Sequence, residues 1–171
     1  MTRTHKIVII SLLVAQALVL HLVERMIPIN FQVPGMRLGL ANIITLVSLY
    51  LFGFKETLLV VILRTTMANL LGGSPSGFLF SLVGGLLSFF IMYFIKKLAD
   101  KKISVIGLSI VGAVFHNVGQ ILVAAFIIHN INIIIYLPVL MISSIATGFF
   151  VGITVKYILG FLERTKLFNI G

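Results

Sequence analysis

Residues 103–128 read ISVIGLSIVGAVFHNVGQILVAAFII and contain no Lys, Arg, Asp or Glu. A helix needs about 20 mainly apolar residues to cross the hydrocarbon core of a bilayer, and this stretch is long enough. The rest of the chain has the same character, because 60% of its 171 residues are hydrophobic and 10% are charged. Soluble domains carry about 25% charged residues. We therefore expect an all-α integral membrane protein.

Five further apolar runs have similar lengths, and short polar or Gly/Pro-containing segments separate them. Gly72-Gly73-Ser74-Pro75 ends one run, since Pro and Gly interrupt helices. The charged pair Lys55-Glu56 forms a polar turn that separates two others. The chain therefore predicts one domain, residues 1–171, folded as a single bundle of six transmembrane helices. The expected spans are 7–27, 38–54, 56–72, 77–95, 103–128 and 133–159.

The basic residues follow membrane topology and do not form a stripe with interleaved aromatics, as nucleic-acid binding would require. Of the 13 Lys and Arg residues, ten fall on the side of a six-span bundle that carries both termini. Arg25 and Arg37 fall on the other side, and Arg64 falls inside a span. Because Lys and Arg are enriched in cytoplasmic loops, we expect a multi-pass protein of the cell membrane with both termini in the cytoplasm. The ten residues are Arg3, Lys6, Lys55, Lys96, Lys97, Lys101, Lys102, Lys156, Arg164 and Lys166.

The chain lacks the residues from which catalytic and metal sites are usually built. It has no Cys and only four acidic residues, Glu24, Glu56, Asp100 and Glu163. Three of these lie in expected cytoplasmic turns or the tail, so no carboxylate pair is available for acid–base chemistry or for magnesium-bound diphosphate. We expect no catalytic residue, no metal site, no cofactor and no enzyme activity of this chain alone.

Arg64 falls near the middle of the third expected span. A basic side chain there costs about 2.5–3.5 kcal/mol on insertion scales, so it must face the bundle interior or a wet cavity. One interpretation is a purely structural buried pair with Glu24. The other is a ligand site to which Arg64 contributes, with Glu24 orienting its side chain.

His116, Asn117 and Gln120 form a polar group inside the fifth expected span. His116 and Gln120 are four residues apart and therefore share one helix face. These side chains could simply form hydrogen bonds that pack the helices, or they could line a ligand site. Three adjacent polar groups favour the second interpretation.

The segment before the second expected span, Pro34-Gly35-Met36-Arg37-Leu38-Gly39-Leu40-Ala41-Asn42, also has features of a binding site. Arg37 and the amide of Asn42 can bind anionic or hydrogen-bonding groups. Gly35 and Gly39 let the backbone approach closely. Interfacial anchoring and helix capping are the structural alternative.

Small residues recur at four-residue spacing, as in Ser81 and Gly85, or Ser144, Gly148 and Gly152. In lipid, this spacing lets helix backbones pack closely. Internal packing of the bundle is the simplest interpretation for most of them. Ser11 and Ala15 on the first span could instead form an outer seam at which a partner docks.

Seven segments together resemble the Gx transporter family, often labelled heptaprenyl diphosphate synthase component I, and more broadly the substrate-binding S components of energy-coupling factor (ECF) transporters. The likeness covers nearly the whole chain. The segments are Leu22-Val23-Glu24-Arg25, the Pro34 to Asn42 segment, Gly53-Phe54-Lys55-Glu56, Leu63-Arg64, Gly84-Gly85-Leu86, His116-Asn117-Val118-Gly119-Gln120 and Tyr136-Leu137-Pro138.

The resemblance implies an S component that captures a small organic nutrient, such as a vitamin or a flavin-like or isoprenoid-related molecule, for ATP-driven import. It also implies a membrane coupling subunit and two cytoplasmic ATPases as partners, with Ser11 and Ala15 as the docking pair. The residues expected to line its outward-facing cavity are Glu24, Arg37, Asn42, Arg64, His116, Asn117 and Gln120.

Two other functions are compatible with the sequence. The chain could be a noncatalytic membrane subunit in heptaprenyl diphosphate or quinone synthesis, since the Asp-rich magnesium-diphosphate motif of such synthases is absent. It could also be a purely structural anchor for a membrane redox assembly.

Overall fold

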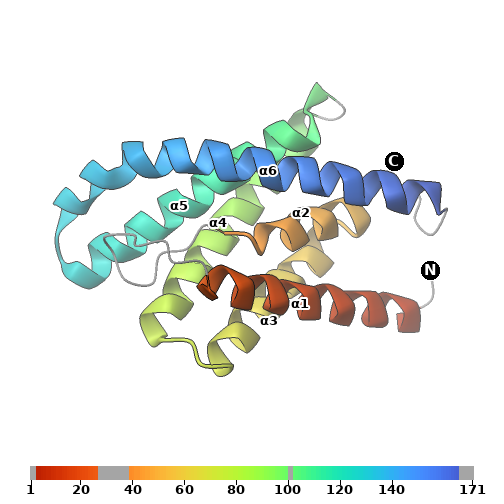
Figure 1. Ribbon diagram of the computed structural model, residues 1–171, viewed down its shortest axis with the longest axis horizontal. Coiled ribbons are helices and arrows are strands. Elements are labelled where there is room, and N and C mark those ends of the chain that lie inside the picture. The colour runs from red at the N-terminus through yellow and green to blue at the C-terminus, as the bar shows by residue number, and fades with distance from the viewer. Residues whose placement is uncertain (1–2, 27–38, 100–101, 166–171) are drawn as a thin grey trace.

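The computed structural model describes residues 3–26, 39–99 and 102–165, and within these residues it contains helices but no strand (Figure 1). The all-α fold is confirmed, and the described residues form the expected six α-helices. That all six cross a membrane, with both termini in the cytoplasm, stays a prediction. In chain order they are α1 (Arg3–Met26), α2 (Asn42–Leu51), α3 (Phe54–Leu70), α4 (Pro75–Ala99), α5 (Val105–Ile128), the short 3-10 helix η2 (Ile131–Tyr136) and α6 (Leu137–Arg164).

Four helical segments are long and apolar enough to cross a membrane, namely Arg3–Glu24, Pro75–Ala99, Val105–Ile128 and Ile131–Arg164. Of the other two helices, α3 has the 17 residues expected of it, whereas α2 is shorter than expected. At 1.5 Å per residue, the ten residues of α2 rise only about 15 Å, half of a hydrocarbon core of about 30 Å. The chain is thus a multi-pass membrane protein in which α2 does not reach across on its own.

The helix ends follow from local sequence. Gly53 has a φ of 93° and Gly72 a φ of 100°, a left-handed conformation that glycine adopts easily, and they separate α2 from α3 and end α3. At the start of α5, the Ser104 hydroxyl accepts a hydrogen bond of 3.0 Å from the Gly107 N–H. Such a cap satisfies one of the amides that a helix start leaves unpaired.

Glycines bring the backbones of α4, α5 and α6 together. A Cβ at Gly119 of α5 would lie 2.8 Å from the Cα of Gly84 of α4, and a Cβ at Gly148 of α6 would lie 2.7 Å from the Cα of Ile110 of α5. Gly152 is equally close to the Cα of Ile106. The packing interpretation of these small residues is confirmed, because any larger side chain would push two helices apart.

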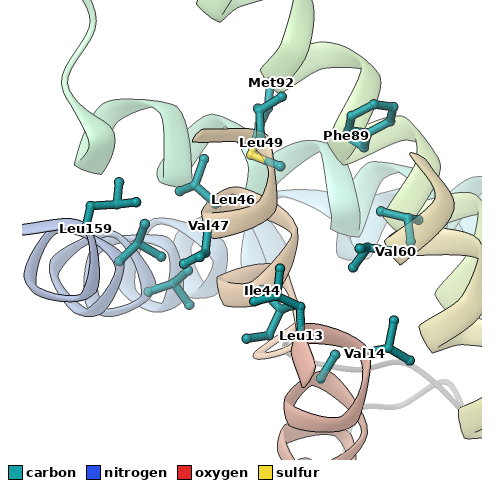
Figure 2. Close-up of a cluster of buried hydrophobic side chains, with 14 of the residues drawn as sticks. Leu13, Val14, Ile44, Leu46, Val47, Leu49, Val60, Phe89, Met92 and Leu159 are labelled. Carbon is teal, nitrogen blue, oxygen red and sulfur yellow. The ribbon is translucent and has the colours of Figure 1, made fainter. Parts of the chain in front are cut away.

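The main apolar core lies in the half of the bundle where α1 begins and α6 ends, two points that Figure 1 places at the same end of the molecule. Figure 2 shows the side chains converging around the second half of α2. Phe89 of α4, Leu46 and Leu49 of α2 and Val60 of α3 are at most 1% exposed there. This half also buries hydroxyls, such as those of Ser48 and Thr57, which lie 3.2 Å apart, whereas the buried charged residues Glu24 and Arg64 lie in the other half.

Candidate functional site

Buried polar side chains from four helices gather where α2 begins. Glu24 of α1, Asn42 of α2, Arg64 of α3 and His116 of α5 are between 3% and 8% exposed, and we call these four residues the polar cluster. Gln120 is 1% exposed and lies one helical turn beyond His116 on α5. Six of the seven predicted binding residues therefore lie inside the bundle, because Asn117 is 5% exposed as well.

Gly39 is the point around which three members of the polar cluster are arranged. Its N–H donates a 2.6 Å hydrogen bond to Oε1 of Glu24. A Cβ at Gly39 would lie 2.9 Å from Nδ2 of Asn42 and 3.0 Å from Cδ2 of His116, and its φ of 85° suits glycine. No larger residue would let α1, α2 and α5 meet at this turn.

Arg64 is hydrogen-bonded to the first residue of α2. Its Nη2 donates a hydrogen bond of 3.2 Å to Oδ1 of Asn42. Glu24, the partner proposed for Arg64 from the sequence, receives the Gly39 N–H, and a direct pair between Glu24 and Arg64 stays a prediction.

Two adjacent glycines of α4 make room for the polar cluster. A Cβ at Gly85 would lie 3.1 Å from Nη2 of Arg64, and a Cβ at Gly84 would lie 3.0 Å from Nδ1 of His116. The sequence interpretation treated these glycines only as helix-packing positions. The Gly84-Gly85 doublet could have indicated that α4 makes room for polar side chains, because the spans before and after it carry Arg64 and His116.

The arrangement is rich in hydrogen-bond donors. The Arg64 guanidinium and the Asn42 amide lie together, and Nδ2 of Asn42 is buried with no hydrogen-bond partner among the described residues. The start of a helix adds partial positive charge. Donors in a region of low dielectric bind anionic or strongly accepting groups well. The chemistry of the polar cluster thus suits a ligand with a carboxylate, a phosphate or carbonyl oxygens.

Asn117 is separated from the polar cluster. Its Nδ2 donates hydrogen bonds to Oγ of Ser144 at 2.6 Å and to the backbone oxygen of Leu140 at 3.4 Å, both on α6. The structure places Asn117 between α5 and α6, where it joins two helices. Arg37 lies outside the described residues.

Ser11 and Ala15, the predicted docking pair, are both exposed on the outer surface of α1. Their exposure leaves them accessible to a partner, and docking itself stays a prediction.

His21 of α1 is buried beside a second group of polar side chains. His21 lines a small pocket with Thr65, Asn69 and Ser81. Oδ1 of Asn69 and Oγ of Ser81 are buried there without hydrogen-bond partners. Thr65 follows Arg64 directly, so this pocket extends the polar half of the bundle. Within the described part of the chain, no group of three or more His, Asp or Glu residues could hold a metal ion.

The fold and the site together define the class: a helical, multi-pass membrane protein with a polar cluster buried inside its bundle. The chain belongs to the heptaprenyl diphosphate synthase component I family, whose model matches residues 13–158. No curated protein and no solved structure matches the chain. The likeness to ECF S components stays a prediction.

Proposed function

We propose that the chain is the noncatalytic membrane component of a heptaprenyl diphosphate synthase. The observation that supports this most is the family match, which extends over residues 13–158. The match includes α2 to α5 completely and most of α1 and α6, so it spans the polar cluster as well as the apolar core.

The noncatalytic role follows from the acidic residues. Magnesium is bound in proteins through carboxylates and substrate phosphates, and the chain has only Glu24, Glu56, Asp100 and Glu163. Glu24 is bonded to Gly39 and Glu56 to Lys6. Since these carboxylates are on separate elements, we expect a partner protein to supply the catalytic site.

The hydrocarbon chain of heptaprenyl diphosphate explains why its synthase would need a membrane component. A heptaprenyl chain has seven five-carbon units, and transferring hydrocarbon from water to lipid yields about 0.8 kcal/mol per CH₂ group. The product therefore leaves the soluble partner for the bilayer. A subunit embedded there can receive the chain as it forms and hold the partner at the membrane.

Reconstitution tests this proposal. The soluble prenyl synthase from the same cell is assayed with nanodiscs that contain this chain and with empty nanodiscs, and heptaprenyl diphosphate is quantified. We expect this chain to raise its formation at least tenfold. Equal product formation with both kinds of nanodisc would contradict the proposal.

The polar cluster favours a second candidate, the S component of an ATP-driven importer. Four buried polar side chains exceed what packing needs, and the buried Nδ2 of Asn42 has no hydrogen-bond partner among the described residues. In that role a small nutrient with acceptor oxygens would bind at Arg64 and Asn42. A coupling subunit would dock at Ser11 and Ala15, and two cytoplasmic ATPases would complete the importer.

Substituting Ala15 separates the two candidates. Ala15→Leu adds bulk at the exposed seam of α1, so an importer would lose its coupling subunit on purification while keeping its ligand. Recovery of a coupling subunit at the wild-type level with Ala15→Leu would overturn this docking site.

A further inference from the structure

An apolar groove runs along the outer side of the bundle between α1 and α6. Its volume is about 490 Å³, within the range of about 300–1,000 Å³ typical of ligand pockets. Among the described residues, no Cα atom of α1 lies within 8 Å of a Cα atom of α6, and α2 forms the floor between them (Figure 1). The groove is lined by Leu12, Ala15, Gln16, Val19 and Leu20 of α1, by Ile43 and Ile44 of α2, and by Thr154 and Ile158 of α6.

The lining offers almost no hydrogen bonds. Apart from Gln16 and Thr154 it is aliphatic, and the Thr154 hydroxyl already donates to the backbone oxygen of Phe150 at 2.9 Å. Leu12 and Val19 are 58% and 59% exposed, so the groove opens sideways to lipid. An occupant must therefore be hydrocarbon and can enter from the bilayer.

The end of the molecule nearest the groove is basic. Arg3, His5 and Lys6 begin α1, Lys55 lies at the start of α3 and Arg164 ends α6. They outnumber the two acidic residues at this end, Glu56, which pairs with Lys6, and Glu163. At 1.5 Å per residue, Leu12 lies about 14 Å from Arg3 and Ile158 about 9 Å from Arg164. His5 also shares a helix face with Leu12 and Gln16, since it precedes them by seven and eleven residues. A hydrocarbon chain in the groove could thus carry an anionic head at this end.

We propose that the groove between α1 and α6 binds the hydrocarbon tail of a prenyl diphosphate, with the diphosphate at the basic end where α1 begins and α6 ends. This inference rests on the proposed function and names the ligand class that the membrane component takes. At about 30 Å³ per heavy atom, the share of a water molecule in the liquid, the groove holds roughly 16 carbons. That is about three five-carbon units, and the remaining units extend to the head and into lipid.

Two variants fill the groove from opposite walls. Ala15→Phe adds a ring from α1, and Thr154→Phe adds one from α6. Ala146→Phe is the matched control, because Ala146 is also exposed but does not line the groove. All three positions face outward, so each variant is expected to fold, and far-UV circular dichroism and size exclusion verify this.

Binding is measured with radiolabelled heptaprenyl diphosphate on the isolated chain in phosphatidylcholine nanodiscs, after subtraction of the label in empty nanodiscs. We expect one saturable site, at least tenfold weaker binding for Ala15→Phe and Thr154→Phe, and binding within twofold of wild type for Ala146→Phe. Heptaprenol, which lacks the diphosphate, is expected to bind at least tenfold more weakly.

Three results would overturn the inference. The first is no saturable binding above empty nanodiscs, which a groove filled by bilayer lipid would give. The second is unchanged binding in both groove variants. The third is binding of heptaprenol as tight as that of heptaprenyl diphosphate. The binding assay contains no catalytic partner, so its result does not depend on whether the chain stimulates a synthase. If the chain stimulates the synthase but does not bind the probe, only the groove assignment fails. If it binds the probe but does not stimulate the synthase, only the proposed function fails.

Discussion

The two ends of α2 lie in opposite environments. Asn42 begins the helix among Glu24, Arg64 and His116, whereas Leu46 and Leu49, one and two turns later, are enclosed by apolar side chains (Figure 2). In a bilayer, apolar packing stabilises the bundle through close contact, while buried polar groups are costly. The difference indicates that the stability of the bundle resides in the apolar half, whereas a small ligand with acceptor oxygens, as in the importer candidate, would bind in the polar half.

The largest effect on stability is expected in the apolar half. Phe89 is fully buried and its ring lies 5.3 Å from that of Phe54. Phe89→Ala should lower the free energy of unfolding by about 2–3 kcal/mol, because a cavity costs about 24 cal/mol per Å³ and roughly 100 Å³ is removed. Titration with SDS from mild detergent measures this. Phe126→Ala, at a 76% exposed ring, is the control, and equal losses would contradict the division into two halves.

A smaller loss is expected at the contact between α4 and α5. Gly119→Ala places a Cβ 2.8 Å from the Cα of Gly84, and such overpacking costs about 1–3 kcal/mol. Gly160→Ala is the matched control, since a Cβ there would meet nothing within 4 Å. The same SDS titration compares them. If Gly119→Ala is as stable as Gly160→Ala, the glycine contact does not limit the distance between the helices.

In the polar half, a substitution should change ligand content more than stability. Arg64→Met keeps the length of the side chain and removes a charge whose burial is costly, so we expect stability to fall by less than about 1 kcal/mol. Small molecules that co-purify with the chain, quantified by mass spectrometry, should fall at least tenfold. Lys97→Met, at an exposed position, should leave both quantities unchanged. A loss of stability with an unchanged small-molecule content would make Arg64 a structural residue.

The smallest effect is expected at the surface pair between α1 and α3. Lys6 Nζ lies 2.7 Å from Glu56 Oε1, and both side chains are partly exposed. Lys6→Gln should cost less than about 1 kcal/mol, and less still at high salt, since exposed ion pairs are weak and screened. SDS titration at low and high salt measures this, with Lys97→Gln as the control. A cost like that of Phe89→Ala would show that this pair, and not the apolar core, anchors α1.

The long helices could be predicted from sequence because a continuous apolar run of 20 or more residues has one stable form in lipid. Within the expected span 38–54, α2 covers only Asn42–Leu51, and Phe54 already belongs to α3. Hydropathy does not detect the turn at Gly39, because that turn is satisfied by the distant carboxylate of Glu24. The late start of α2 is therefore a tertiary effect, whereas its end follows from the local turn at Gly53.

The polar cluster was predictable in part for the same reason. Arg64 and His116 are costly in lipid, so their burial in the bundle could be expected. Asn117 follows His116 by about 100° around the helix and so faces α6. The roles of Gly39, Gly84 and Gly85 depend on which helices come close, and one sequence does not specify that.

Identifying the proteins that co-purify with this chain in mild detergent is the most direct test of its assignment as a membrane component of heptaprenyl diphosphate synthase. The account predicts that mass spectrometry will recover a soluble prenyl synthase in stoichiometric amount. Recovery of a membrane coupling subunit with two ATPases, and no prenyl synthase, would contradict it and establish the importer instead.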